Sequence, residues 1–284
     1  MARFEPTRLP TNISRLRGAR VLVAEDNATN QRVTQLILES GGHTATIVGN
    51  GEAALDALEE GRFDIALFDL SMPVLSGIQA LRMYRFTTAK PIPILILSAN
   101  VTPDVIAECQ RAGCAEFIPK PLRAASLLDA VERHLILLEP ATPPNPIPSE
   151  AKPSLSLVDT PIVDVQVLED LGRLSPDSTF IERLVAGFRS DADRIAADVA
   201  TALDARRYEA IKDIAHALKG GSASVGALQL MHCAARLEKT GADVLRQRPT
   251  QLVEEMQRTI RETFRVLDQF VEQRRERLHS VYPE

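Results

Sequence analysis

Short, continuously apolar runs alternate with amphipathic stretches through the first half of the chain. The runs at 21–23 and 94–97 are apolar at every position, which is typical of strands buried on both faces of a sheet. Five such strand–helix units in a row predict an open parallel sheet with helices on both faces. The strands are expected at 20–24, 44–48, 65–68, 94–97 and 116–118, and the helices at 28–40, 51–60, 76–86, 103–112 and 122–138.

The second half of the chain shows helical periodicity only. Apolar residues recur at helical spacing over 181–203 and 252–271, and shorter helical patterns lie at 207–223 and 227–239. Each of these helices carries one apolar stripe, which has to be buried against another helix. The pattern therefore predicts an antiparallel four-helix bundle over 162–279.

A proline-rich segment separates the two halves. Proline occupies seven of the 23 positions from 139 to 161, and such a segment behaves as an extended spacer that can reach roughly 70 Å. We therefore expect a leader at 1–19, an α/β domain at 20–138, a linker at 139–161 and the helical domain at 162–279.

Composition excludes several classes of protein. The net charge of −5 argues against a strongly basic surface of the kind that binds nucleic acid. No apolar run approaches the roughly 18 residues that a membrane helix needs. Cys109, Cys114 and Cys233 lack metal or disulfide spacing, which favours a reducing, cytoplasmic location.

Acidic residues follow two of the predicted strands. Glu25 and Asp26 come after the first strand, and Asp69 comes after the third. Ligand sites of open parallel sheets lie beyond the carboxyl ends of the strands, and in the order 2-1-3-4-5 these two strands are neighbours. Because clustered carboxylates repel one another, the three acids need a cation. Oxygen ligands with open positions suit Mg²⁺.

Two more strand ends lead to the same crevice. Ser98 ends the fourth strand, and Lys120 follows the fifth. A hydroxyl and an ammonium beside Asp69 would bind a phosphoryl group on that carboxylate, because lysine and Mg²⁺ neutralise its charge during transfer. Prolines flank the lysine, and the Lys120–Pro121 bond is a candidate cis peptide.

These motifs resemble the receiver family of response regulators, which has a flavodoxin-like α/β fold. The matching stretches are 22–27, 69–73 with Gly77, 98–99 and 119–121, in the order and spacing of that family and covering about 20–138. Glu25 departs from the family pattern by replacing one aspartate of an acidic pair, and Ser71 occupies a variable position that influences the lifetime of the phosphoryl group. The resemblance implies that Asp69 is the phosphoacceptor. It implies that Asp26, Asp69 and the Ser71 carbonyl bind Mg²⁺, with Glu25 reaching the ion through water. It also implies that Ser98 and Phe117 form a switch pair, although Phe117 also fits an ordinary core position.

One histidine in the second half lies on a predicted helix with small and basic neighbours. His216 points away from the apolar stripe of its helix and is expected to face solvent. Lys219 and Gly220 share its side of the helix, and Lys212 lies one turn earlier. An exposed neutral imidazole can attack an acyl phosphate, nearby lysines offset the phosphoryl charge, and glycine permits close approach of a partner. Glycine inside a helix costs about 1 kcal/mol relative to alanine, so its presence suggests such a need.

The segment 216–227 resembles the signature of histidine phosphotransfer (HPt) domains: histidine, any residue, leucine, lysine, glycine, then small residues and a later glycine. The resemblance implies that His216 is a second phosphoacceptor, supported by Lys219, Gly220 and Lys212. A receiver followed by an HPt domain is similar to the C-terminal part of hybrid sensor histidine kinases. The sequence shows no kinase ATP-binding pattern, and Met1 is either a natural start or a cut within a longer parent, so enzymatic activity stays open.

The predicted function is a two-component phosphorelay. A kinase histidine phosphorylates Asp69, and His216 carries the phosphoryl group to or from a receiver aspartate, within one molecule or between two. The expected partners are a histidine kinase and a downstream response regulator. The main alternative is a phosphorylation-switched binding module whose receiver sequesters a partner enzyme or regulator.

Two further classes fit poorly. A phosphohydrolase of the haloacid dehalogenase type needs a second acid two residues after its aspartate, where this chain has Ser71. A DNA-binding regulator needs a basic recognition helix, which the second half lacks.

Overall fold

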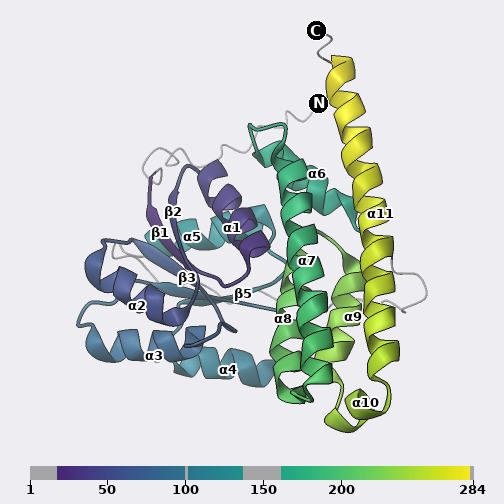
Figure 1. Cartoon of the computed structure of the whole chain (residues 1–284). Coiled ribbons are helices and arrows are strands. Elements are labelled where there is room, and N and C mark those ends of the chain that lie inside the picture. The colour runs from purple at the N-terminus through teal and green to yellow at the C-terminus, as the bar shows by residue number, and fades with distance from the viewer. Residues whose placement is uncertain (1–17, 100–101, 137–160, 282–284) are drawn as a thin grey trace, which may run out of the picture.

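The computed structural model describes residues 18–99, 102–136 and 161–281. Its first half is a five-stranded parallel sheet in the order β2-β1-β3-β4-β5, which confirms the predicted flavodoxin-like topology (Figure 1). The elements lie within one or two residues of the predicted ranges. They are β1 (Arg20–Ala24), α1 (Ala28–Ser40), β2 (Thr44–Val48), α2 (Gly51–Glu60), β3 (Ile65–Asp69), α3 (Gly77–Thr87), β4 (Ile94–Ser98), α4 (Pro103–Arg111), β5 (Glu116–Pro119) and α5 (Ala124–Ile136).

Helices cover both faces of the sheet, as expected for strands that are apolar at every position. Val21 and Val23 of β1 point to one face and pack in the same cluster as α1 and α5. Leu22 and Ala24 point to the other face, where the cluster includes residues of α2, α3 and α4. Successive side chains of a strand alternate between faces, so β1 contributes to both cores.

The second half is a helical bundle. Four long helices match the predicted set, and the short α6 and α10 were not predicted. Phe188 of α7 and Phe264 of α11 pack in the bundle core with ring centroids 5.4 Å apart. The helices are α6 (Val165–Leu174), α7 (Phe180–Asp204), α8 (Tyr208–Ser224), α9 (Leu228–Lys239), α10 (Ala242–Gln247) and α11 (Pro249–Val281).

The two halves lie side by side, with α1 of the first against α7 and α8 of the second (Figure 1). One hydrophobic cluster contains Val33 and Leu36 of α1 together with the core of the bundle. Residues 1–17 of the predicted leader (1–19) and 139–160 of the predicted linker (139–161) lie outside the described residues. None of the described helices combines the length and apolarity that a membrane span requires.

Candidate functional site

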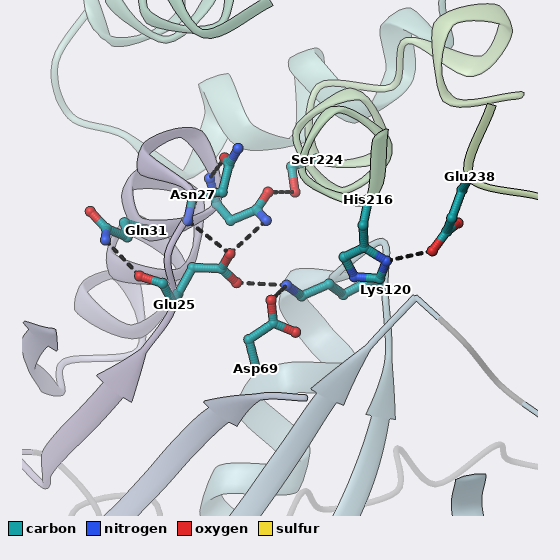
Figure 2. A network of polar contacts seen from close by, with 9 residues as sticks. Glu25, Asn27, Gln31, Asp69, Lys120, His216, Ser224 and Glu238 are labelled. Carbon is teal, nitrogen blue, oxygen red and sulfur yellow. Dashed lines mark hydrogen bonds and ion pairs between the residues drawn. The ribbon is translucent and has the colours of Figure 1, made fainter. Parts of the chain in front are cut away.

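The polar residues predicted from the strand ends come together at the carboxyl edge of the sheet. Lys120 reaches this edge because its backbone N–H donates a 2.8 Å hydrogen bond to the carbonyl of Ser98. The side-chain ammonium of Lys120 then lies 2.6 Å from Oε2 of Glu25 and 2.9 Å from Oδ2 of Asp69. All three side chains are almost fully buried. Figure 2 shows this chain of ion pairs across the mouth of the sheet.

The backbone around Asp69 is held by a glycine that begins α3. A Cβ atom on Gly77 would lie 2.1 Å from the carbonyl oxygen of Asp69, so no other residue fits without moving the strand. The helix is stabilised there by a capping box, in which Ser76 and Gln79 satisfy each other's backbone N–H groups. Gly77 therefore fixes how closely α3 approaches the phosphoacceptor candidate.

Three carboxylates form a cluster that fits a divalent cation. One oxygen each from Glu25, Asp26 and Asp69 lies within 4.8 Å of the others. Burial raises the pKa of Glu25, and the Asp69 carboxylate adds to that rise while Lys120 opposes it. Burial and Asp69 also raise the pKa of Asp26. A hard divalent cation would relieve the repulsion among these acids. Such a cation also prefers oxygen ligands, and these side chains offer oxygen only.

The remaining residues predicted for this site are Ser71, Ser98 and Phe117. Ser71 lines the crevice, Ser98 is buried at the end of β4, and Phe117 is partly buried against the cluster on the α2–α4 face. The Lys120–Pro121 bond is cis, as the sequence suggested. The metal-ligand role of Ser71 and the switch role of Ser98 and Phe117 stay predictions.

The first turn of α1 is built onto the acidic cluster. The Asn27 side chain caps the helix by accepting from the backbone N–H of Asn30 at 3.0 Å. The Asn30 amide donates a 2.8 Å hydrogen bond to Oε1 of Glu25, and the Gln31 amide donates to the Glu25 carbonyl at 2.6 Å. Glu25 is thus held by α1 on one side and by Lys120 on the other.

His216 lies on α8, and its ring is held by a glutamate from the next helix. Nδ1 of His216 lies 2.7 Å from Oε1 of Glu238, and the Lys219 ammonium lies 2.6 Å from Oε2 of the same carboxylate. Burial alone would raise the pKa of Glu238, but hydrogen bonds from Lys219 and His216 outweigh it and lower that pKa. An ionised carboxylate only accepts, so the contact fits the neutral tautomer of His216 in which Nδ1 carries the proton and Nε2 has the lone pair.

The expectation that His216 faces solvent is wrong. Its side chain is 22% exposed; it contacts Glu238 and lines a crevice that residues of the first half also line. Gly220 is buried, and a Cβ there would lie 3.2 Å from the Asn30 amide nitrogen. Lys212 is exposed and lines the same crevice. The glycine beside the histidine does permit close approach of another element, and that element is α1 of the same chain.

The two sites open onto one shared cavity. The cavity has a volume of about 830 Å³ and is lined by Ser71 and Lys120 from the sheet edge and by Lys212, His216 and Lys219 from α8. Figure 2 shows the His216 ring above the Lys120–Asp69 pair. The Lys120 ammonium that pairs with Asp69 therefore borders the same space as the imidazole, and this space is large enough for a phosphoryl group.

Sequence reasoning missed Glu238, Asn30 and Ser224. Glu238 lies 22 residues after His216, and Ser224 lies 194 residues from Asn30, whose side-chain oxygen accepts its hydroxyl. Neither contact has a local signal, because side chains on different helices meet only after packing.

Comparison with known proteins covers both halves. Residues 21–132 match the family model of the response regulator receiver domain, and residues 183–278 match that of the Hpt domain. The sensory/regulatory protein RpfC of Xanthomonas campestris pv. campestris (strain 8004) is 31% identical over 221 residues, which are 76% of this chain and 30% of RpfC. The aerobic respiration control sensor protein ArcB of Escherichia coli (strain K12) is 26% identical over 255 residues, 88% of this chain and 32% of ArcB.

The chain therefore spans about a third of the length of these two relatives. Among solved structures, the receiver domain of sensor histidine kinase PA1611 from Pseudomonas aeruginosa PAO1 is 34% identical, with a TM-score of 0.40. The match covers 42% of this chain and 98% of that domain, whose structure has a magnesium ion coordinated in the active site cleft.

Proposed function

Because this chain is a phosphorelay protein that carries a receiver domain followed by an Hpt domain, we propose a route for the phosphoryl group in which Asp69 receives it and His216 takes it from Asp69. One observation carries this proposal. Lys120, which pairs with Asp69, lines the same cavity as His216. The ammonium that contacts the donor carboxylate and the acceptor ring thus border one space, in which a phosphoryl group could be positioned for transfer.

The chemical step follows from the protonation of the ring. Nε2 of His216 attacks the phosphorus with its lone pair, and the bond between phosphorus and the Asp69 carboxylate oxygen breaks. The bonding electrons return to Asp69, which becomes a free carboxylate again. The proton stays on Nδ1, where the Glu238 carboxylate stabilises the positive charge that develops on the ring. In the reverse direction, Asp69 attacks and His216 leaves.

Cationic side chains offset the charge of the group in transit. Lys120 contacts Asp69, while Lys212 and Lys219 border the cavity from α8. Phosphoryl transfer depends mainly on positioning and on neutralising the phosphoryl oxygens. These lysines meet that requirement from both sides of the cavity.

Glu25, Asp26 and Asp69 fit a divalent cation, and we assign Mg²⁺ because the donors are oxygens only. The Ser71 carbonyl would complete the protein ligands. When bound, the ion would neutralise the phosphoryl oxygens and draw the three acids together. Lys120 already offsets the negative charge of Glu25 and Asp69. It would therefore keep these carboxylates close together when the ion dissociates.

The donor to Asp69 is a kinase histidine, and the acceptor after His216 is the aspartate of a separate response regulator. The alternative of a phosphorylation-switched binding module is not favoured, because the chain matches both a receiver and an Hpt family model. An enzyme bound by the receiver stays a prediction.

Radiolabel transfer tests the proposed route. Purified protein is incubated with a small labelled acyl phosphate and Mg²⁺, and the wild type is compared with Asp69→Asn and His216→Gln. We expect two labels in the wild type, one alkali-labile on Asp69 and one acid-labile on His216. The His216 label should vanish in Asp69→Asn, and the Asp69 label should accumulate in His216→Gln.

Matched variants control for nonspecific effects of the substitutions. His134→Gln removes another histidine that contacts a glutamate, since His134 Nε2 lies 2.9 Å from Glu116. Asp64→Asn removes a surface aspartate paired with Arg20. Both should label like the wild type. Absence of Mg²⁺-dependent label from Asp69 and His216 would contradict the proposal.

A further inference from the structure

Exposed apolar side chains gather beside one helix of the receiver domain. Among the described residues, six large apolar side chains are exposed, and three of them lie on α3 or on the loop before it. They are Val74, Met83 and Phe86, with exposed fractions of 77%, 50% and 93%. α3 covers the face of the sheet opposite α1, whereas the bundle packs against α1 (Figure 1). A single exposed apolar residue is ordinary, but a group of them marks a surface that another molecule covers.

A groove with a volume of about 440 Å³ lies between α2 and this apolar group. Val74, Leu75 and Met83 line one side of it, and Leu55 of α2 lines the other. The backbone N–H of Gly51 donates a 3.1 Å hydrogen bond to the carbonyl of Leu75, and a Cβ on Gly51 would lie 2.5 Å from that oxygen. The loop and α2 are therefore held close together, so the groove is formed before a partner binds, which lowers the cost of binding.

Val74 adopts a backbone conformation that valine rarely takes. Its φ is 68°, in the left-handed region where a β-branched residue is strained. The side chain is also largely exposed, so the receiver itself gains little burial from it. Glycine or asparagine would adopt this conformation with less strain. A partner that buries the valine gives it a role that the isolated receiver lacks.

The α2 side of the groove is acidic. Glu52, Asp56 and Glu59 are exposed and line it. Their spacing of four and three residues places them along one side of the helix, over about 10 Å. None of these carboxylates lies within ion-pair distance of a basic side chain in the part of the chain that the structure describes. A partner would therefore meet apolar side chains along one edge of the groove and unpaired negative charges along the other.

We propose that this groove is a docking site for an amphipathic helix of another protein, which carries lysine or arginine beside its apolar face. Apolar side chains at helical spacing would insert between α2 and α3, and the basic side chains would pair with the acids of α2. Charges spread over two helical turns fit a helix better than a compact small ligand. The same acids would repel nucleic acid and anionic membranes.

The groove shares no lining residue with the cavity at His216, and the inference does not rest on the proposed relay. Its test therefore uses no phosphodonor. The outcome of the docking experiment and the outcome of the radiolabel experiment are independent of each other.

A synthetic peptide tests the site. The probe is a fluorescent helix of about 18 residues, or five turns, with leucine on one face and lysine at the flanking positions, and the full chain is titrated into it. We expect saturable binding with a Kd of about 10 µM, weakened about tenfold when salt is raised from about 0.1 M to about 1 M. The same peptide with glutamate in place of lysine should not bind. Hydrogen exchange of the α2 and α3 amides should slow when the lysine peptide binds.

Two matched pairs of variants locate the binding. Asp56→Lys reverses the central charge of the groove, and Asp193→Lys makes the same change at an exposed aspartate of α7. Met83→Gln removes an apolar side chain from the groove, and Ile136→Gln does so at a similarly exposed position of α5. We expect Asp56→Lys to weaken peptide binding about tenfold and Met83→Gln about fivefold. Both control variants should bind like wild type.

Equal weakening by Asp56→Lys and Asp193→Lys would show that the peptide responds only to the net charge of the chain, and this would overturn the proposal. Failure of wild type to bind the lysine peptide would overturn it as well. Sedimentation of the chain without peptide tests a second copy as the occupant. A dimer that dissociates in Asp56→Lys would overturn the assignment to a helix of another protein, whereas sedimentation that the substitution leaves unchanged would support it.

Discussion

The hydroxyl of Ser224 on α8 donates a 2.7 Å hydrogen bond to the side-chain oxygen of Asn30 on α1. The same asparagine donates to Glu25 of the acidic cluster. The contact joins the helix that carries His216 to the turn that supports the metal-site candidate. Docking of the two domains and the arrangement of the pocket are therefore linked through one side chain.

Ser224→Ala should weaken docking of the two domains. The substitution leaves the buried Asn30 oxygen without its partner, which costs about 1 kcal/mol and slows transfer to His216 by roughly fivefold. Hydrogen exchange of the α1 amides should rise in parallel. Ser222→Ala is the matched control, since Ser222 is also buried on the same helix and its hydroxyl has no hydrogen-bond partner among the described residues. Equal effects of both variants would contradict the interpretation.

Glu238→Gln should reduce the rate of transfer to His216 without preventing labelling of Asp69. An amide does not stabilise a developing imidazolium as a carboxylate does, and it leaves Lys219 without its ion pair. We expect a loss of about 10- to 100-fold, the usual cost of removing a group that orients a reactive histidine. Single-turnover rates of transfer to His216 measure the loss.

Glu255→Gln is the control for that experiment. Glu255 is also an ion-paired glutamate of the bundle, and its partner is Arg236 on α9. Its loss should leave the rate of transfer to His216 unchanged. A Glu238→Gln protein with a wild-type rate would show that the ring needs no fixed tautomer.

Magnesium should stabilise the protein more at pH 8 than at pH 6. The pKa of Glu25 is raised to about 7 and that of Asp26 is raised as well, so protons compete with the cation below neutral pH. For a carboxyl group with a raised pKa, the metal-free fold loses stability as pH rises from the unfolded pKa to the folded one. The cation offsets this loss.

Thermal unfolding with and without Mg²⁺ measures this effect. Mg²⁺ at about a hundredfold excess over its Kd adds about 2.7 kcal/mol, and we expect the full gain at pH 8 and a smaller one at pH 6. In Asp26→Asn the gain should shrink at both pH values. A gain that grows as pH falls would contradict the assignment of these acids to the cation.

Lys120→Met should destabilise the receiver domain strongly in the absence of Mg²⁺. It leaves the buried carboxylates of Glu25 and Asp69 without their shared cation, and breaking a buried pair costs about 3 kcal/mol or more. The loss should be smaller at pH 6, where Glu25 takes up a proton, and Mg²⁺ should restore part of it. Urea unfolding followed by circular dichroism measures the change, with the exposed Lys90→Met as a neutral control.

The sequence by itself determined most of the fold and the composition of the acidic pocket. Apolar runs identified β1 and β4, and the acids and Lys120 were assigned to one crevice because parallel strands end at a common edge. The motif around His216 identified the second phosphoacceptor candidate. These features are local: they depend on the order of residues within one strand, one strand end or one turn of helix.

Only the tertiary structure decided what surrounds His216. The pairing of its ring with Glu238 and the docking of α1 against Gly187 and Gly220 join residues far apart in the chain. Helical periodicity indicates which face of a helix is apolar. It does not indicate which other helix packs against the polar face. His216 was expected in solvent for this reason, whereas packing of the two domains leaves its side chain 22% exposed in a cavity that Lys120 also lines.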